Sequence, residues 1–197
     1  MFNIKFALSH FLHQRKATSR HGLHSPFVYR LVDKVIYDFS NKKVYAEIEK
    51  TGKHGKKLNK TDKLLYRLLA DAKPQNVWLL GKYHQFDQHI LQHASVHVEP
   101  KSINNPTDWK DAFMPDVVYL DARLNPQSTM DYFNRLLPKM QPGTLLIVNN
   151  IHENMLTKTS WNIMKSHQKV TASVSLFWMG LTYCRPGQVK EDFFIKF

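Results

Sequence analysis

The sequence predicts an α/β fold in which helices cover a mostly parallel sheet. Three short apolar runs have the composition of buried strands, and stretches with helical periodicity separate them. These runs are Val77–Leu80, Val117–Asp121 and Leu145–Asn149. Continuous apolar strands that alternate with helices are typical of a parallel sheet with both faces covered. The end of the chain differs, because its alternating apolar pattern favours an antiparallel hairpin.

That hairpin is predicted from two neighbouring stretches, Val170–Trp178 and Leu181–Cys184. Met179 and Gly180 lie between them, which suggests that the turn is there. Residues 193–197 are a candidate for one further short strand segment.

Helical patterns fill the remaining segments of this α/β region. They cover Thr61–Ala72, Phe86–Ala94, Gln127–Leu137 and Glu153–Ser166. Thr61 is the expected N-cap of the first, because a threonine hydroxyl can accept from the first turn of a helix. We therefore expect one α/β domain over residues 61–197.

Residues 1–60 form a different, strongly basic part of the chain. They hold 13 Lys and Arg residues against 4 Asp and Glu residues, whereas the whole chain has a net charge of +12. A helix is expected over residues 2–14 and another from Ser25 and Pro26, and the lysine-rich stretch 40–61 contains a flexible basic loop, TGKHGKKLNKT, over residues 51–61. Such charge suggests an anionic partner (nucleic acid, acidic lipid or an acidic protein), or simply a solubilising segment.

The first of these helices places Phe2, Phe6, Phe11 and Leu12 at amphipathic spacing. Such a stripe packs on its own domain, pairs with a sister subunit in a homodimer, or lies on a membrane surface. No apolar run approaches the length of a transmembrane segment. Cys184 is the only cysteine, so no intramolecular disulfide can form, and we expect a cytoplasmic protein.

Several segments resemble a known family. They are RHGLHSPFVY, LLYRLL, the turn at Gly81, VVYLDA, LLIVNNIHENM and SVSLFWMGLTYCR. Together they are similar to a group of bacterial class I S-adenosylmethionine-dependent methyltransferase-like proteins, from about residue 20 to the end. The resemblance implies a Rossmann-like methyltransferase sheet that binds S-adenosylmethionine at the carboxyl ends of its strands.

Residues at three strand ends correspond to the cofactor site of that family. Gly81 corresponds to the first glycine after strand one, Glu99 to the acid that binds the ribose, and Asp121 to the acid after the fourth strand. Two positions depart from the pattern, because Leu79 replaces the first-strand acid and Gln85 the second glycine. Asp121 and His152 are also the candidates for catalytic roles.

The end of the fifth strand departs further. Relatives carry two aspartates there, which suit a divalent cation, whereas this chain has Asn149 and Asn150. Since hard cations prefer carboxylate oxygens, no metal site is expected. Asp121, Asn149 and Asn150 either make turn hydrogen bonds or bind a cation weakly. His152 is a candidate general base, with a strand-end hydrogen bond as the alternative role. His84, His89, His93 and His97 are expected to be exposed helix histidines rather than a metal site.

The connection between strands two and four is short. Strand two is expected over Val96–Glu99, and Val117 follows soon after it. A helix rises about 1.5 Å per residue and a strand about 3.3 Å, so one short helix around Thr107–Phe113 fills the gap. We therefore expect the third, edge strand of the family sheet to be missing.

Two functions follow as hypotheses. The chain is a methyltransferase-like enzyme with an unknown acceptor, or it is a non-catalytic methyltransferase-fold scaffold whose basic N-terminal arm binds a partner.

Overall fold

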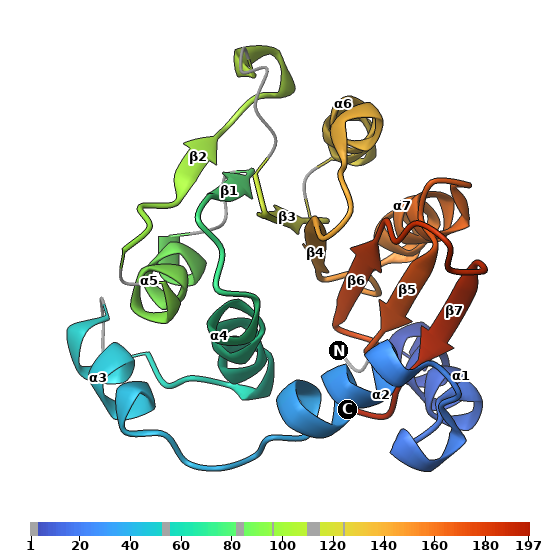
Figure 1. Cartoon of the computed structure of the whole chain (residues 1–197), viewed down its shortest axis with the longest axis horizontal. Helices are drawn as coiled ribbons and strands as arrows, with labels where there is room; N and C mark the ends of the chain where they lie inside the picture. Colours follow the sequence, from blue (N-terminus) through green and yellow to red (C-terminus); the bar gives the residue numbers. More distant parts are fainter. Residues whose placement is uncertain (1–3, 53–55, 82–84, 96, 110–114, 124) are drawn as a thin grey trace.

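A computed structural model describes residues 4–52, 56–81, 85–95, 97–109, 115–123 and 125–197. Within them, seven strands form one mixed sheet in the order β2-β1-β3-β4-β6-β5-β7, with helices packed against it (Figure 1). The strands are β1 Val77–Leu80, β2 Lys101–Ile103, β3 Val117–Asp121, β4 Leu145–Asn149, β5 Ala172–Ser175, β6 Met179–Tyr183 and β7 Glu191–Phe194. The predicted α/β sheet is confirmed.

The helices follow the sequence pattern closely in the α/β region. The α-helices are α1 Ile4–Lys16, α2 Pro26–Leu31, α3 Lys43–Thr51, α4 Lys60–Ala72, α5 Gln85–Ala94, α6 Pro126–Leu136 and α7 Met155–Ser166. Shorter turns are the 3-10 helices Arg20–Gly22, Pro106–Asp108 and Leu137–Lys139, and the π-helix Val32–Ile36.

Alternation along the strands divides the core into two layers. Leu79 of β1 and Tyr119 of β3 pack into one layer, which contains residues of α2, α3, α4 and α5. Leu80 and Leu120 point into the other layer, which contains residues of α6 and α7. Successive side chains of a strand point to opposite faces, so strands that are apolar throughout require cover on both sides. The continuous apolar runs of the sequence have this physical cause.

The hairpin prediction is confirmed, but its turn lies earlier than expected. β4 pairs antiparallel with β6, which pairs antiparallel with β5. Met179 and Gly180 belong to β6, and the turn consists of Leu176–Trp178 instead. Phe177 adopts a φ of 72° there and is fully buried. Burial of its ring against α1 explains why a bulky residue, and not Gly180, takes the turn position. β7 then adds a parallel strand beside β5.

The position predicted for strand two was wrong. β2 begins at Lys101 and not at residue 96, and Glu99 precedes it as an exposed residue. Pro100 has no N–H to donate to a sheet, so pairing with β1 begins after it. Between β2 and β3 the described residues contain the 3-10 helix Pro106–Asp108 and no strand, and β2 is the edge strand of the described sheet. The rest of the helix expected at 107–113 falls largely outside the described residues.

The segment before residue 61 is more ordered than expected. α3 occupies the lysine-rich stretch just before the predicted loop, where no helix was expected, because Tyr45 and Ile48 are buried in the core layer that also contains α4. The N-cap of α4 is Asn59 and not Thr61, and Asn59 forms a reciprocal capping box with Asp62. The Ser25 cap before Pro26 is confirmed. The domain boundary at residue 60 stays a prediction.

α1 is attached to the C-terminal strands by its inner face. Phe6 packs edge-on against Phe177, and the backbone N–H of Thr18 donates to the carbonyl of Phe194 (2.7 Å). Figure 1 shows the result, with the first helices lying beside β5 and β7. Among the described residues, none of the helices combines the length and the hydropathy that crossing a membrane requires.

Candidate functional site

The carboxyl ends of β1, β3 and β4 meet at one edge of the sheet. β1 is paired with β2 on one side and with β3 on the other, both in parallel. The strand order reverses at this point, which is where open α/β sheets bind their ligands. Gly81, Asp121 and Asn149 end the three strands or follow them directly. We refer to this region as the carboxyl edge.

Gly81 has the backbone conformation that only glycine adopts readily. It is buried and has a φ of 109°. Its N–H donates to the carbonyl of Ile103 at the end of β2 (3.2 Å). Gly81 therefore turns the chain out of β1 at the place expected for the first glycine. Residues 82–84, which follow it, lie outside the described part, as does the predicted His84.

Asp121 is fully buried, and its carboxylate accepts hydrogen bonds from Arg123 and from Asn150. The Arg123 backbone N–H donates to Oδ1 (2.9 Å), and the Arg123 guanidinium donates to both carboxylate oxygens, at 2.6 Å in its shortest contact to Oδ2. Asn150 Nδ2 also donates to Oδ1 (3.0 Å). The carboxylate holds the pKa of Arg123 above its ordinary value. Asp121 is thus a carboxylate whose charge is already matched by a cation of the same chain.

A second polar network lies beside it and was not expected from the sequence. The Tyr119 hydroxyl donates to Asp87 Oδ2 (2.6 Å) and accepts from Asn149 Nδ2 (2.7 Å). Burial raises the pKa of Asp87 to about 6, and it also raises the pKa of Tyr119. Asp87 comes from α5 and Tyr119 from within β3, so no local motif joins them. An acid in an otherwise apolar helix face was the only signal that could have identified Asp87.

A small polar cavity opens between these two networks. Its volume is about 240 Å³. Its lining residues are Lys56, Asn59, Thr61, Asp62, Phe86, Asp87, Arg123, Asn149, Asn150 and Trp178. This volume is smaller than that of the pockets, roughly 300–1,000 Å³, that bind most small ligands. Both positively and negatively charged side chains line the cavity.

Two of the predicted site residues lie elsewhere. Glu99 is exposed and comes before β2, so it is at the amino end of that strand and not beside Gly81. His152 follows β4 but faces α1, where Ser9 Oγ lies 3.3 Å from its Nδ1 and Phe177 stacks on its ring. Burial lowers the pKa of His152 to about 4, so the imidazole is neutral at pH 7.

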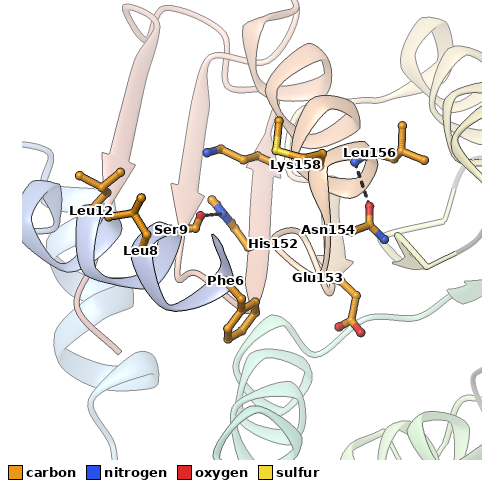
Figure 2. A pocket seen from close by; sticks show the side chains of 10 residues that line it. Phe6, Leu8, Ser9, Leu12, His152, Glu153, Asn154, Leu156 and Lys158 are labelled. Atoms are coloured by element: carbon orange, nitrogen blue, oxygen red, sulfur yellow. Dashed lines mark hydrogen bonds between the residues drawn. The ribbon is translucent and has the colours of Figure 1, made fainter. Parts of the chain in front are cut away.

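His152 belongs to a second and larger depression, which we call the α1–α7 groove (Figure 2). The groove has a volume of about 520 Å³ and lies between α1 and the start of α7. Its walls are mostly apolar. They consist of Phe6, Leu8, Ser9, Leu12, His152, Glu153, Asn154, Met155, Leu156 and Lys158.

The residues at the carboxyl edge do not fit a divalent cation. Such ions require several oxygen ligands, preferably carboxylates. Asp121 offers both of its oxygens to Arg123, and the side-chain amide of Asn149 is turned toward Tyr119. A guanidinium therefore already neutralises the carboxylate that a metal would need. Asn150 instead makes hydrogen bonds of the kind expected at a turn: its N–H donates to Asn149 Oδ1, and its Nδ2 donates to Asp121 Oδ1.

Of the four histidines singled out in the sequence, His84 lies outside the described residues. His89 and His93 lie one turn apart on α5, and Nε2 of each lies within hydrogen-bond distance of the Thr51 hydroxyl (3.1 and 3.4 Å). In the described part of the chain, no three His, Cys, Asp or Glu side chains gather as a metal site would require.

No protein-family model and no curated protein sequence matches the chain. Solved structures do match its fold. A methyltransferase from Podospora anserina, PaMTH1, bound to S-adenosylhomocysteine, has a TM-score of 0.56 at 7% identity, over 83% of this chain and 97% of its own. A putative caffeoyl-CoA O-methyltransferase from Staphylococcus aureus has a TM-score of 0.53 at 11% identity, over 92% and 100%.

The O-methyltransferase TomG from Streptomyces achromogenes, in complex with S-adenosylmethionine, has a TM-score of 0.51 at 13% identity, over 80% and 95%. The sheet of this chain is thus a methyltransferase-type sheet, and the expected resemblance is confirmed for the fold.

Proposed function

We propose that the protein binds S-adenosylmethionine at the carboxyl edge and transfers its methyl group without a divalent cation. The single observation that supports this proposal is the position of Gly81, whose positive φ ends β1 beside the point where the strand order reverses. A glycine there lets a ligand approach the backbone closely. Bound S-adenosylmethionine would supply the methyl group, and the acceptor class stays open.

The residues around Gly81 have separate roles in this proposal. Asp121 keeps Arg123 in place by accepting four hydrogen bonds from that residue. Arg123 provides the fixed positive charge of the site. Glu99 was expected to bind the ribose, but it precedes the amino end of β2 whereas Gly81 lies beside the carboxyl end, so we no longer assign it that contact. His152 lines the α1–α7 groove, so in this proposal it would accept a proton from an acceptor that enters there.

Calorimetric titration with S-adenosylmethionine tests the proposal. We expect a Kd below about 100 μM, that is, a binding free energy stronger than about −5.5 kcal/mol. Gly81→Val should weaken binding at least tenfold, because a branched side chain at that φ distorts the turn. Gly143→Val is the matched control, since Gly143 also has a positive φ (94°) and no atom lies within 4 Å of the point where its Cβ would be. Heat that persists in Gly81→Val, or no heat at about 1 mM ligand, contradicts the proposal.

Independence from metal is tested separately. Addition of a chelator should leave the titration unchanged. The double substitution Arg123→Ala with Asn150→Asp should create Mn²⁺ binding, because Asn150 Nδ2 lies 3.0 Å from Asp121 Oδ1 and an aspartate there pairs two carboxylates. Mn²⁺ binding by the unchanged protein that is lost in Asp121→Asn would contradict this part.

A second candidate function is the non-catalytic scaffold, and one observation favours it. The oxygens of Asp121 already accept hydrogen bonds from Arg123 and Asn150, so the acid has little left to offer a ligand. The scaffold would bind an anionic partner through residues 1–60. Lys43 and Lys50 are exposed on α3 and suit such a contact.

Salt-dependent retention on an anionic column tests the scaffold. Lys43→Gln with Lys50→Gln should elute at clearly lower salt than Lys169→Gln with Lys196→Gln, which removes the same charge outside residues 1–60. Equal elution would exclude α3 as the anionic contact.

A further inference from the structure

α1 has two apolar faces, and only one of them packs on the protein. The inner face carries Phe6, whose ring lies 5.2 Å from that of Trp178, and His13, whose Nε2 lies 3.3 Å from the carbonyl oxygen of Ile195. The outer face repeats Ile4, Leu8 and Leu12, one helical turn apart. Leu8 and Leu12 are 55% and 53% exposed. Contacts on the inner face hold α1 in place and leave the outer face turned to solvent.

The start of α7 extends this apolar surface. Met155 is 70% exposed and Leu156 is 57% exposed, and both line the α1–α7 groove together with Leu8 and Leu12. Figure 2 shows Leu8 and Leu12 on α1 and Leu156 on α7, at opposite sides of the groove. Large apolar side chains gathered in one exposed patch mark an interaction site.

The charged side chains around this apolar surface of α1 and α7 indicate which kind of partner it binds. α1 contains no acidic residue, and its last turn carries Arg15 and Lys16. Arg15 lies 6.0 Å from the ring of Phe11, which is itself exposed on the outer face. Lys158 lines the groove, and Glu153 is the acidic residue among its lining side chains. The surface therefore combines apolar side chains with a net positive charge.

We propose that the outer face of α1 and the α1–α7 groove dock on an anionic lipid membrane. Apolar side chains that reach the level of the acyl chains, with Lys and Arg at the level of acidic headgroups, are the composition of an interfacial helix. A second copy of the chain fits the same surface less well, because each copy carries a net charge of +12 and the two patches have the same sign. This docking does not depend on methyl transfer.

Sedimentation of the full chain with vesicles tests the proposal. Vesicles of phosphatidylcholine with about 30% phosphatidylserine should bind the protein, and vesicles of phosphatidylcholine alone should bind it much more weakly; higher salt should reduce binding. Leu8→Gln with Leu12→Gln should lower the partition coefficient by about tenfold or more. Because both side chains are exposed, we expect the thermal midpoint of this variant to stay within a few degrees of the unchanged protein.

Two further variants separate the contributions. Ile163→Gln is the matched apolar control, since Ile163 is 49% exposed on α7 but does not line the groove, and it should bind as the unchanged protein does. Arg15→Gln with Lys158→Gln should lose most of the preference for acidic lipid and keep the apolar contribution.

Four results would overturn the proposal. The first is no binding to acidic vesicles, and the second is binding that Leu8→Gln with Leu12→Gln leaves unchanged. The third is a dimer in light scattering that this double variant dissociates, which would assign the surface to a second copy. Binding to an oligonucleotide in place of vesicles would assign the basic residues to nucleic acid and also reject the lipid.

Discussion

The carboxyl edge and the α1–α7 groove differ in how far their side chains are already paired within the protein. At the edge, Asp121, Arg123 and Asn150 bond to one another, and Asp87 bonds to Tyr119. In the groove, Leu8 and Met155 remain largely exposed. Polar groups that are paired within the chain have less free energy to gain from a ligand, whereas exposed apolar groups gain by burial. This difference indicates that a ligand at the edge gains little from the paired side chains and depends on backbone contact at Gly81, whereas a ligand in the groove gains by burying exposed apolar area.

The largest effect is expected where the ion pair at the edge is broken. Arg123→Ala should destabilise the protein by about 3 kcal/mol, because it leaves the fully buried Asp121 carboxylate without its cation. Arg30→Ala is the matched control, since Arg30 pairs with Asp71 at an exposed site and should lose less than about 1 kcal/mol. Urea denaturation measures both. Equal losses of unfolding free energy in the two variants would show that the Arg123–Asp121 pair contributes no more to stability than the exposed Arg30–Asp71 pair.

The next largest effect is the pH dependence of stability that arises from Asp87. Its pKa is raised by burial to about 6 from an ordinary value of 3.8. The folded state therefore favours the protonated acid, and the stability from this group is complete below pH 3.8 and lost as the pH rises through 6. The loss is about 2–3 kcal/mol in all. Denaturation of Asp87→Asn at pH values of about 4.5 and about 7.5 should lack this decrease; an unchanged decrease would place its origin elsewhere.

His152 gives the groove a smaller pH dependence of the opposite sign. Burial lowers its pKa to about 4 from 6.5, so the folded state favours the neutral ring. Its contribution to stability is complete above pH 6.5 and is lost as the pH falls through 4. The side chain is only partly buried, and solvent screening reduces the effect. His152→Gln should show a shallower loss between pH 6.5 and pH 4 in the same denaturation series. A loss as steep as in the unchanged protein would contradict this assignment.

The smallest effect concerns the rim of the edge cavity. Asn59→Ala should cost about 1 kcal/mol, because it removes the oxygen that accepts from Asp62 N at the start of α4. Thr61→Ala should cost less, since the Thr61 hydroxyl only donates to Asn59 Oδ1. Thermal midpoints of the two variants measure the difference. A larger loss in Thr61→Ala would restore Thr61 as the cap.

The sequence by itself determined the three apolar parallel strands of the sheet. Apolar runs predicted β1, β3 and β4 because both faces of those strands are buried, and that requirement is visible in every residue of the run. The Ser25–Pro26 start of α2 was equally local. Val96–Glu99 failed as a strand because apolar alternation there is short, and the missing N–H of Pro100 moved the pairing.

Only the tertiary structure decided what the site residues can do. Asp121 was predicted as a ligand-binding acid, but it accepts a hydrogen bond from Asn150, and that contact depends on how the ends of β3 and β4 meet. The contact of Asp87 with Tyr119 joins residues 32 positions apart, so no spacing rule could reveal it. The exposed face of α1 likewise became visible only once Phe6 and His13 were seen to face Phe177. An amphipathic pattern tells that a helix has an apolar face, whereas packing decides which part of that face remains in water.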